Sequence, residues 1–230
     1  MMTLIFQGKT KDVYENENGT ITLKLKDDAT GKDGVFDPGE NSVGLSIDGL
    51  GRESLRLSVY YFELLTAEGI PNHFISCNIA DATMEVKPVE MFGKGLEFVC
   101  RRKADGSFLR RYGAYARFGD DLDYIVEVTL KDDERKDPPV TMETLIALRI
   151  MTAEEYEICA ALTKKIAKLL TADLQKRGLE LYDMKFEFGK SKIGSNDEIL
   201  LADEISAGCM RVYKNGRIVP PMKLGGLVVK

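Results

Sequence analysis

Apolar residues recur at helical spacing in two stretches of the chain. In residues 54–68 they return every three or four positions, and Gly69 follows as a stop signal. The stronger pattern covers about residues 152–177, where Thr152 and Glu155 form a capping box. The spacing therefore predicts two amphipathic helices.

Short runs with strand character fill much of the first half of the chain. Residues 12–14 and 20–26 flank a polar, turn-rich spacer and predict a hairpin. Residues 84–91 and 96–103 are joined by a glycine-containing turn and predict a second hairpin. Residues 27–52 are rich in glycine and aspartate, with little apolar periodicity, and predict a long loop that is functional or mobile.

Residues 179–188 alternate between apolar and charged side chains with the period of a strand. The apolar side chains, from Tyr182 to Phe188, share one face, and the charged side chains share the other. Residues 190–197 predict a turn, and residues 198–205 predict a returning strand. Acidic and basic groups are therefore expected to meet on a hairpin beside apolar residues.

Length, composition and net charge indicate a globular protein and disfavour nucleic acid as a ligand. The 230 residues predict one large domain or two closely packed lobes, since a domain takes about 150 residues. Hydrophobic residues make up 44% and charged residues 30%, as in globular chains that bury a core. The net charge is −5. Because binders of nucleic-acid backbones are normally basic, this charge disfavours nucleic acid and leaves only a local basic pocket open.

The chain contains a single histidine, His73. Ser-His-Asp hydrolases, Cys-His proteases and multi-histidine metal sites all require imidazole groups that this chain lacks. A bound metal should therefore be a hard cation such as Mg²⁺, held by carboxylates and by a phosphate ligand. Acid–base chemistry would fall to lysine, aspartate or glutamate. His73 itself follows a helix stop and is expected to have a structural or surface role.

The four cysteines are widely spaced and form no CxxC pair, which favours free thiols in a reducing compartment. The N-terminus has no basic segment followed by an apolar run of signal-peptide length. No stretch approaches the ~18 apolar residues that a membrane span requires. We therefore expect a cytoplasmic protein without membrane contact, and a homodimer is left open.

Glu187 and Asp203, in the predicted hairpin, form a candidate Mg²⁺ pair, because Mg²⁺ is usually held by one or two carboxylates and substrate phosphates. Lys185 would neutralise phosphate charge beside them. The alternative is a solvated strand face on which these groups form ordinary cross-strand ion pairs.

Two further segments are candidate anion sites. Residues 101–111 carry four arginines around the turn Gly106–Ser107, and a hydroxyl near guanidinium groups suits a phosphate monoester. The alternative is a basic surface turn. Residues 8–11 form a glycine–lysine stretch that suits a polyphosphate, although they lack the P-loop pattern and a flexible basic N-terminus is the alternative. The charge run 131–138 is typical of a solvated loop.

Several short motifs follow one another in a specific order between residues 8 and 213. They are Gly8–Tyr14, Asp27–Thr30, Gly69–Pro71, Leu96–Arg101, Gly106–Ser107, Arg110–Arg111, Asp137–Pro138, Asp183–Gly189, Ala202–Ser206 and Arg211. Taken together in this order, they resemble the SAICAR synthetase family of purine biosynthesis.

The resemblance implies a two-lobed α+β fold with antiparallel sheets and ATP in the cleft between the lobes. Residues 1–90 would form a strand-rich N-terminal lobe with one helix. Residues 91–230 would form a C-terminal α+β lobe with the metal and ribonucleotide sites. The implied activity is an ATP-dependent ligase that joins the carboxylate of the ribonucleotide CAIR to the amine of L-aspartate. The implied products are SAICAR, ADP and phosphate, formed through an acyl phosphate.

The resemblance also implies roles for individual residues, which fall into four sets. The ATP contacts would be Lys9, Thr10, Lys11 and Val13. The substrate contacts would be Arg101, Gly106, Ser107, Arg211, Asp33 and Asp137, with the serine at the 5′-phosphate. The catalytic residues would be Lys185, Asp183 and Lys131, the last also touching phosphate. The Mg²⁺ ligands would be Glu187 and Asp203.

The chain departs from the family pattern at three motifs. The Lys-Gly-x-x-Asn-Asn stretch is Leu50–Leu55 here, the Ser-Pro-Asp segment is Ser206–Gly208, and Arg-Leu-Trp is Arg211–Tyr213. These departures keep two alternatives open. One is a diverged ligase or kinase that acts on another phosphorylated carboxylate, and the other is a non-catalytic nucleotide-binding module.

Overall fold

The computed structural model describes residues 2–40, 42–193 and 197–229. The chain divides into two compact units. Unit 1 comprises Met1–Glu90, Lys190–Cys209 and Pro220–Lys230, and unit 2 comprises Met91–Gly189 and Met210–Val219. Residues 190–209 and 220–230, which the sequence assigned to a second lobe, therefore group with the first 90 residues.

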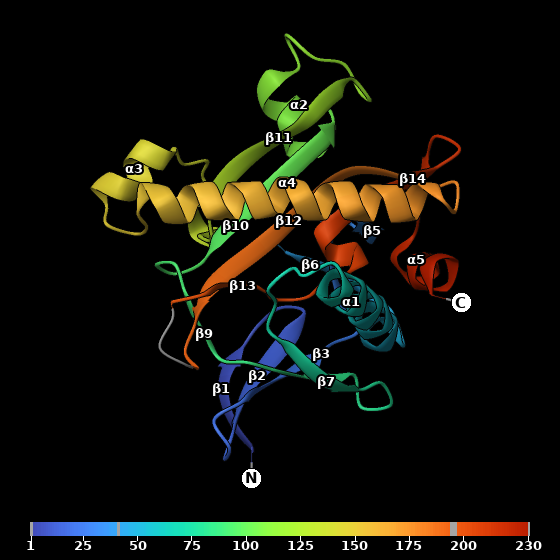
Figure 1. Cartoon of the computed structure of the whole chain (residues 1–230). Coiled ribbons are helices and arrows are strands. Elements are labelled where there is room, and N and C mark those ends of the chain that lie inside the picture. The colour runs from blue at the N-terminus through green and yellow to red at the C-terminus, as the bar shows by residue number, and fades with distance from the viewer. Residues whose placement is uncertain (1, 41, 194–196, 230) are drawn as a thin grey trace. The chain divides into compact units, whose positions relative to one another are not determined.

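Unit 1 is built on a five-stranded antiparallel sheet in the order β1-β2-β3-β8-β7 and a three-stranded sheet in the order β5-β4-β6. Helix α1 packs against β3 and lies beside α5 (Figure 1). The bounds are β1 (Met2–Gln7), β2 (Lys11–Asn16), β3 (Ile21–Leu25), β4 (Asp28–Lys32), β5 (Val35–Phe36), β6 (Val43–Ser46), α1 (Leu50–Ala67), β7 (Phe74–Asn78), β8 (Thr83–Val86), β13 (Ile199–Ala202), η2 (Ala207–Cys209) and α5 (Pro221–Val228).

Unit 2 is built on the antiparallel strand order β11-β10-β12-β14-β15, and helix α4 runs across β10 and β11 (Figure 1). The bounds are β10 (Leu96–Lys103), α2 (Gly106–Tyr112), β11 (Asp121–Leu130), η1 (Asp133–Arg135), α3 (Met142–Ala147), α4 (Ala153–Gln175), β12 (Glu180–Ser191), β14 (Met210–Lys214) and β15 (Arg217–Ile218). Strand β9 (Val89–Met91) spans the point in the sequence where unit 1 ends and unit 2 begins. The last two residues of β12, Lys190 and Ser191, are assigned to unit 1.

Both predicted helices are present. Helix α4 begins at Ala153, and its Thr152–Glu155 capping box is formed as predicted. Helix α1 begins at Leu50, earlier than the predicted residue 54. The Asp27 carboxylate accepts hydrogen bonds from the amides of Gly49 (3.1 Å) and Gly51 (2.9 Å), which stabilises the first turn from a distant segment. The pattern of apolar positions does not predict these hydrogen bonds, because Asp27 is far from the helix in sequence.

One hairpin prediction and one loop prediction are wrong. The segments 84–91 and 96–103 do not form a hairpin, since β8 pairs with β3 and β7 whereas β10 pairs with β11 and β12. Pro88 interrupts the first segment, because proline offers no N–H to a ladder. The predicted loop 27–52 contains β4, β5 and β6, which are short and carry too few apolar residues to show a period.

The strand predicted over residues 198–205 is shorter in the structure. Strand β13 ends at Ala202, and Asp203 takes a left-handed backbone conformation with φ of 66°. Asp203 therefore does not continue the alternation of the strand. Within the predicted turn 190–197, the amide of Ser191 donates to the carbonyl of Glu198 at 2.9 Å. Residues 194–196 of that turn lie outside the described residues.

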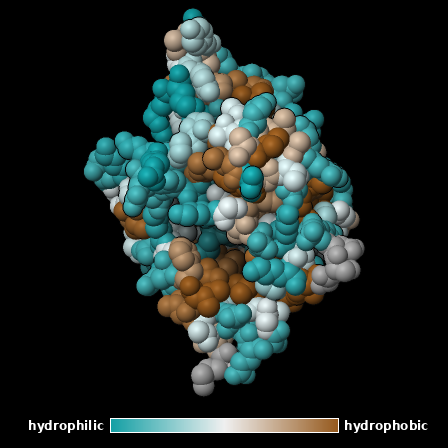
Figure 2. Space-filling view, turned by 90° about the vertical axis from the view of Figure 1, so that its left-hand side faces the viewer, coloured by the Kyte–Doolittle hydropathy of each residue, from teal (hydrophilic) through white to brown (hydrophobic). Residues whose placement is uncertain are grey.

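Exposed hydrophobic side chains occur on several elements of the described residues. On the face that Figure 2 displays, hydrophobic patches are separated by hydrophilic side chains. Strand β1 carries four of the exposed apolar residues, Met2, Leu4, Ile5 and Phe6. Among the described residues, no helix has both the length and the apolar character needed to cross a membrane.

Candidate functional site

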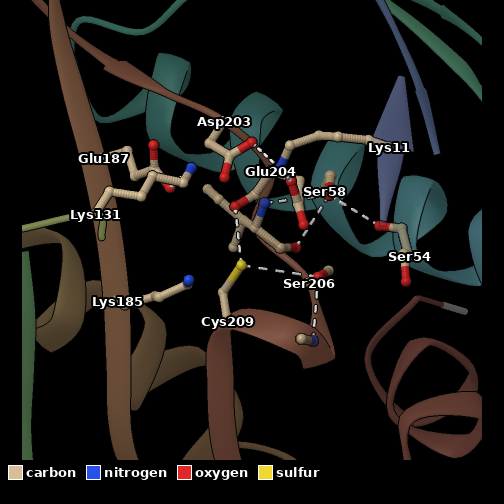
Figure 3. A network of polar contacts seen from close by, with 12 residues as sticks. Lys11, Ser54, Ser58, Lys131, Lys185, Glu187, Asp203, Glu204, Ser206 and Cys209 are labelled. Atoms are coloured by element: carbon tan, nitrogen blue, oxygen red, sulfur yellow. Dashed lines mark hydrogen bonds and ion pairs between the residues drawn. The ribbon is translucent and has the colours of Figure 1, made fainter. Parts of the chain in front are cut away.

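Unit 1 gathers one lysine and two neighbouring carboxylates. The Nζ of Lys11, at the start of β2, forms ion pairs with Asp203 and Glu204 (Figure 3). All three side chains are at most 16% exposed. Burial, and then the charge of Asp203, raise the pKa of Glu204 to about 7. The cluster therefore offers hard oxygen ligands beside an ammonium group.

Buried hydrogen bonds from other elements hold the segment that carries these acids. The Nε2–H of His73 donates to the carbonyl of Asp203 at 2.9 Å. Burial lowers the pKa of His73 to about 4, so this imidazole is neutral at pH 7. Ser58, on α1, accepts a hydrogen bond from the amide of Ile205 at 3.2 Å. The only histidine of the chain thus has the structural role expected for it.

The glycine–lysine stretch forms a tight turn between β1 and β2. The amide of Gly8 donates to the carbonyl of Lys11 at 2.9 Å. A Cβ at position 8 would lie 2.7 Å from the same carbonyl oxygen, so the turn requires glycine. Lys26 donates to the Gly8 carbonyl at 2.8 Å and fixes the turn. This turn leaves Lys9 exposed, while Val13 lies inside the sheet, paired with Phe6 and Leu23.

Unit 2 contains a buried line of three charged residues. Arg101 on β10 pairs with Asp183 on β12, which pairs with Arg211 on β14. Asp183 Oδ2 accepts hydrogen bonds from Arg101 Nη1 at 2.9 Å and from Arg211 Nη1 at 2.8 Å. All three residues are buried. Two guanidinium groups are therefore fixed side by side through one carboxylate.

The serine of the Gly-Ser turn joins this group. Arg101 Nη2 donates to Ser107 Oγ at 2.8 Å, in the first turn of α2. Gly106 has φ of 51°, and a Cβ there would lie 2.6 Å from the guanidinium carbon of Arg211. Glycine is thus required so that Arg211 can lie against the start of α2. The Arg101–Ser107–Arg211 group thus brings together three of the predicted substrate contacts, and anion binding there stays a prediction.

Two further charged residues of β12, Lys185 and Glu187, are also paired within unit 2. Lys185 Nζ lies 2.6 Å from Glu97 Oε1, and Thr129 donates to the other oxygen of Glu97 at 3.0 Å. Burial opposes ionisation of Glu97, but Lys185 and these hydrogen bonds outweigh it and lower its pKa. Lys131 Nζ lies 2.7 Å from Glu187 Oε1 (Figure 3). Both lysines thus lie next to acids that hold them in place.

The structure brings together some predicted residues and separates others. Arg101, Ser107, Asp183 and Arg211 meet in unit 2, and Lys131 meets Glu187 there. Lys11 meets Asp203 in unit 1. Glu187 and Asp203, the predicted Mg²⁺ pair, belong to different units, so their pairing stays a prediction. Across residues 2–40, 42–193 and 197–229, no three or more His, Cys, Asp or Glu side chains are grouped to hold a metal.

The two predicted substrate-pocket aspartates lie in turns. Asp33 and Gly34, both with positive φ, form the exposed two-residue turn between β4 and β5. Asp137 Oδ1 accepts a hydrogen bond from the amide of Asp132 at 2.8 Å and shapes the loop after β11. Thr10 lies beside Lys11, and its carbonyl accepts from the amide of Lys26 at 2.8 Å. Their contacts with a substrate or nucleotide stay predictions.

Several contributors were missed by sequence reasoning. They are Glu97, Asp105, Glu127 and Glu204, which pair with predicted site residues across the chain. Glu97 and Glu204 lie inside the motifs Leu96–Arg101 and Ala202–Ser206, and Asp105 directly precedes Gly106, but the sequence alone assigned none of them a role. These pairs join residues far apart in sequence, and a single sequence does not specify the sheet register that creates them.

The chain is similar in sequence to proteins of one known family. Residues 4–221 match the family model described as SAICAR synthetase. The chain is 52% identical over 229 residues to the phosphoribosylaminoimidazole-succinocarboxamide synthase of Clostridium tetani, covering 100% of both chains. It is 36% identical to the synthase of that name from Thermotoga maritima, covering 93% of this chain and 86% of the relative.

Solved structures agree with the sequence relatives. A structure titled SAICAR synthetase (Type-2) in complex with ADP superposes with a TM-score of 0.81 at 31% identity, covering 93% of this chain and 86% of the other. The Ehrlichia chaffeensis synthase superposes with a TM-score of 0.83 at 27% identity, covering 94% and 87%. The α+β fold class with antiparallel sheets, predicted from the sequence, is confirmed.

Proposed function

Since the chain belongs to the SAICAR synthetase family, we propose that it joins CAIR and L-aspartate at the expense of ATP, giving SAICAR, ADP and phosphate. The observation that carries this proposal is the 52% identity with a named synthase over the full length of both chains. The product places the enzyme in purine biosynthesis. The clusters described above supply the chemical groups that such a reaction needs.

The Arg101–Ser107–Arg211 group is proposed to bind the 5′-phosphate of the ribonucleotide. Arginine presents planar pairs of N–H donors that match phosphate oxygens, and these charge-assisted bonds are strong. Asp183 holds both guanidinium groups, so its contacts favour a positioning role over direct catalysis. Gly106 contributes by leaving room for Arg211. Asp33 and Asp137 are proposed to line the substrate pocket.

The glycine turn is proposed to contact ATP through Lys9, Thr10, Lys11 and Val13. An ADP complex of a SAICAR synthetase supports nucleotide binding by this fold. Asp203 and Glu187 are proposed as Mg²⁺ ligands, because carboxylate oxygens suit a hard cation. Mg²⁺ would neutralise charge on the triphosphate. The donor set fits this role, since Mg²⁺ commonly takes only one or two protein carboxylates and completes its shell with phosphate and water.

The proposed reaction has two steps, phosphoryl transfer to the carboxylate and then attack by the amine. A carboxylate oxygen of CAIR attacks the γ-phosphorus, and the bond to the bridging oxygen of ADP breaks. The amine of aspartate then attacks the acyl carbon, loses a proton, and expels phosphate as the C–O bond breaks. Positioning and charge neutralisation dominate such transfers. Lys131 and Lys185 are proposed to balance the developing negative charge.

The cellular setting follows the same reasoning. We propose that the enzyme works in the cytoplasm on small molecules alone, with no nucleic-acid or membrane partner. The net charge of −5 supports the exclusion of nucleic acid. Sedimentation of the purified chain tests for the homodimer that the sequence leaves open.

A turnover assay with omissions tests the proposed function. Purified protein with CAIR, aspartate and Mg-ATP should release phosphate and ADP in equal amounts, and leaving out any one substrate should abolish release. Absence of turnover with bound ATP would instead favour a diverged ligase or kinase, and a panel of phosphorylated carboxylates would identify its substrate. A Glu187→Gln variant separates enzyme from binding module, because an enzyme should lose turnover far more than fold stability. Nucleotide affinity is measured in parallel, since the substitution also removes a proposed metal ligand.

A further inference from the structure

We propose that Tyr213, acting through Asp105, is a positioning residue for the phosphate-binding group of the ribonucleotide site. This inference rests on the proposed function. The juxtaposition that carries it is a hydrogen-bonded link between the strand that bears Arg211 and the helix that bears Ser107. All residues of the link belong to unit 2.

The link has two hydrogen bonds. The hydroxyl of Tyr213, on β14, donates to Asp105 Oδ2 at 2.8 Å. The other oxygen, Asp105 Oδ1, accepts from the amide of Gly106 at 2.7 Å and caps the start of α2. Because Arg211 lies two residues before Tyr213 and Ser107 two residues after Asp105, the link sets the distance between these two anion-binding groups.

The same carboxylate oxygen also faces Arg211. Asp105 Oδ2 lies 3.8 Å from Arg211 Nε, and the Asp105 and Arg211 side chains are 15% and 8% exposed. Asp183 holds the other side of the guanidinium at 2.8 Å. The hydroxyl of Tyr213 takes up part of the negative charge of Asp105. Without it, Asp105 would attract Arg211 more strongly and compete with a bound phosphate.

The ring of Tyr213 is held independently of its hydroxyl. It stacks on Tyr182 with 4.0 Å between ring centroids, and Phe118 meets it edge-on at 5.8 Å. Burial and the hydrogen bond to Asp105 raise the pKa of Tyr213, so the phenol keeps its proton across the working range. A Tyr213→Phe variant therefore removes one donor and leaves the aromatic stack in place.

Steady-state kinetics of Tyr213→Phe test the inference. The KM for CAIR should rise about tenfold, the loss expected for one hydrogen bond to a charged group. The values of kcat and of the KM for ATP should change by less than about twofold. Tyr182→Phe is the matched control, because it removes the hydroxyl of the other stacked ring and should leave the KM for CAIR unchanged.

A substrate without the phosphate makes the test specific. For the 5′-dephosphorylated nucleoside of CAIR, wild type and Tyr213→Phe should have equal kcat/KM, since the lost contact acts on the phosphate. Equal loss for nucleotide and nucleoside, or an unchanged KM for CAIR, would overturn the inference. On an Asp105→Asn background, where the competing charge is absent, Tyr213→Phe should cause little further change in the KM for CAIR, because both residues act through one link.

Titration with ribose 5-phosphate separates this inference from the proposed function. Wild type should bind this probe about tenfold more tightly than Tyr213→Phe. An inactive wild type would contradict the proposed function, while the titration would still decide the role of Tyr213. Equal affinity of the two proteins for the probe would reject that role.

Discussion

At the scale of single residues, the site depends on buried charges that are paired rather than exposed. Arg101, Asp183 and Arg211 form one line across three strands, and the central carboxylate serves both arginines. Removing one partner of a buried pair leaves uncompensated charge in a poorly solvated place. The residues that position the arginines therefore matter for stability and for binding together.

The Asp183→Asn variant tests this dependence. It keeps the side-chain shape but leaves two buried guanidinium groups without their shared anion, so the free energy of unfolding should fall by about 3 kcal/mol. Urea unfolding at pH 7 measures the change. The half-exposed Glu180 pairs with Lys103 at the surface, and Glu180→Gln should cost less than about 0.5 kcal/mol. Similar losses in both variants would contradict the account.

Gly106 provides a second test at this scale. In Gly106→Ala the new methyl group would meet the Arg211 guanidinium, so the KM for CAIR should rise at least about fivefold. The positive φ adds a backbone cost of about 1 kcal/mol to the free energy of unfolding. Gly216→Ala is the matched control, since Gly216 also has a positive φ but faces open space. Gly216→Ala should lower the free energy of unfolding and leave the KM for CAIR unchanged. A raised KM in the control, or none in Gly106→Ala, would reject the steric argument.

At the scale of elements, the edge strand β11 is tied to its neighbours by Glu127. Arg101 of β10 binds this carboxylate at 2.7 Å, and Arg111 of α2 binds it as well. Burial opposes ionisation of Glu127, but the two arginines outweigh it and lower its pKa. The acid thus joins the strand, the sheet and the short helix that carries Ser107.

The lowered pKa of Glu127 predicts a pH dependence of stability. The folded protein binds fewer protons than the unfolded chain, so the contribution is complete above about pH 4.5 and is lost as pH falls further. Glu127→Gln should be less stable than wild type at pH 7, and the gap should narrow below pH 4.5. Urea unfolding between pH 3 and 7 measures it. A gap that stays constant across this range would contradict the assigned cause.

The helices and strands differ in how well the sequence predicts them. Helix α4 and its capping box were predicted because both signals are local. The hairpin over residues 84–103 was wrong, since alternation predicts a strand but not its partner. The left-handed turn at Asp203 and the pairing of Arg101 with Asp183 depend on distant contacts. The site residues were therefore predicted through family motifs, whereas the roles of Glu97, Asp105 and Glu127, which pair with them, were not.

At the scale of the whole molecule, the departures from the family motifs leave the three residues of the buried arginine line themselves unchanged. The stretch Leu50–Leu55 is the start of α1, and Ser206 accepts a hydrogen bond from Gly208 at 3.1 Å in η2. Arg101, Ser107 and Arg211 are retained together with Lys11 and Asp203. This retention, with full-length identity to a synthase, favours the same reaction over a diverged one.

The central claim is that a carboxylate of the ribonucleotide is activated by phosphoryl transfer before the amine attacks. Turnover of CAIR labelled with ¹⁸O at both carboxylate oxygens, followed by mass spectrometry of the products, measures this directly. The account predicts one ¹⁸O atom in each phosphate released and one in each SAICAR amide carbonyl. Unlabelled phosphate, or no SAICAR at all, would contradict it.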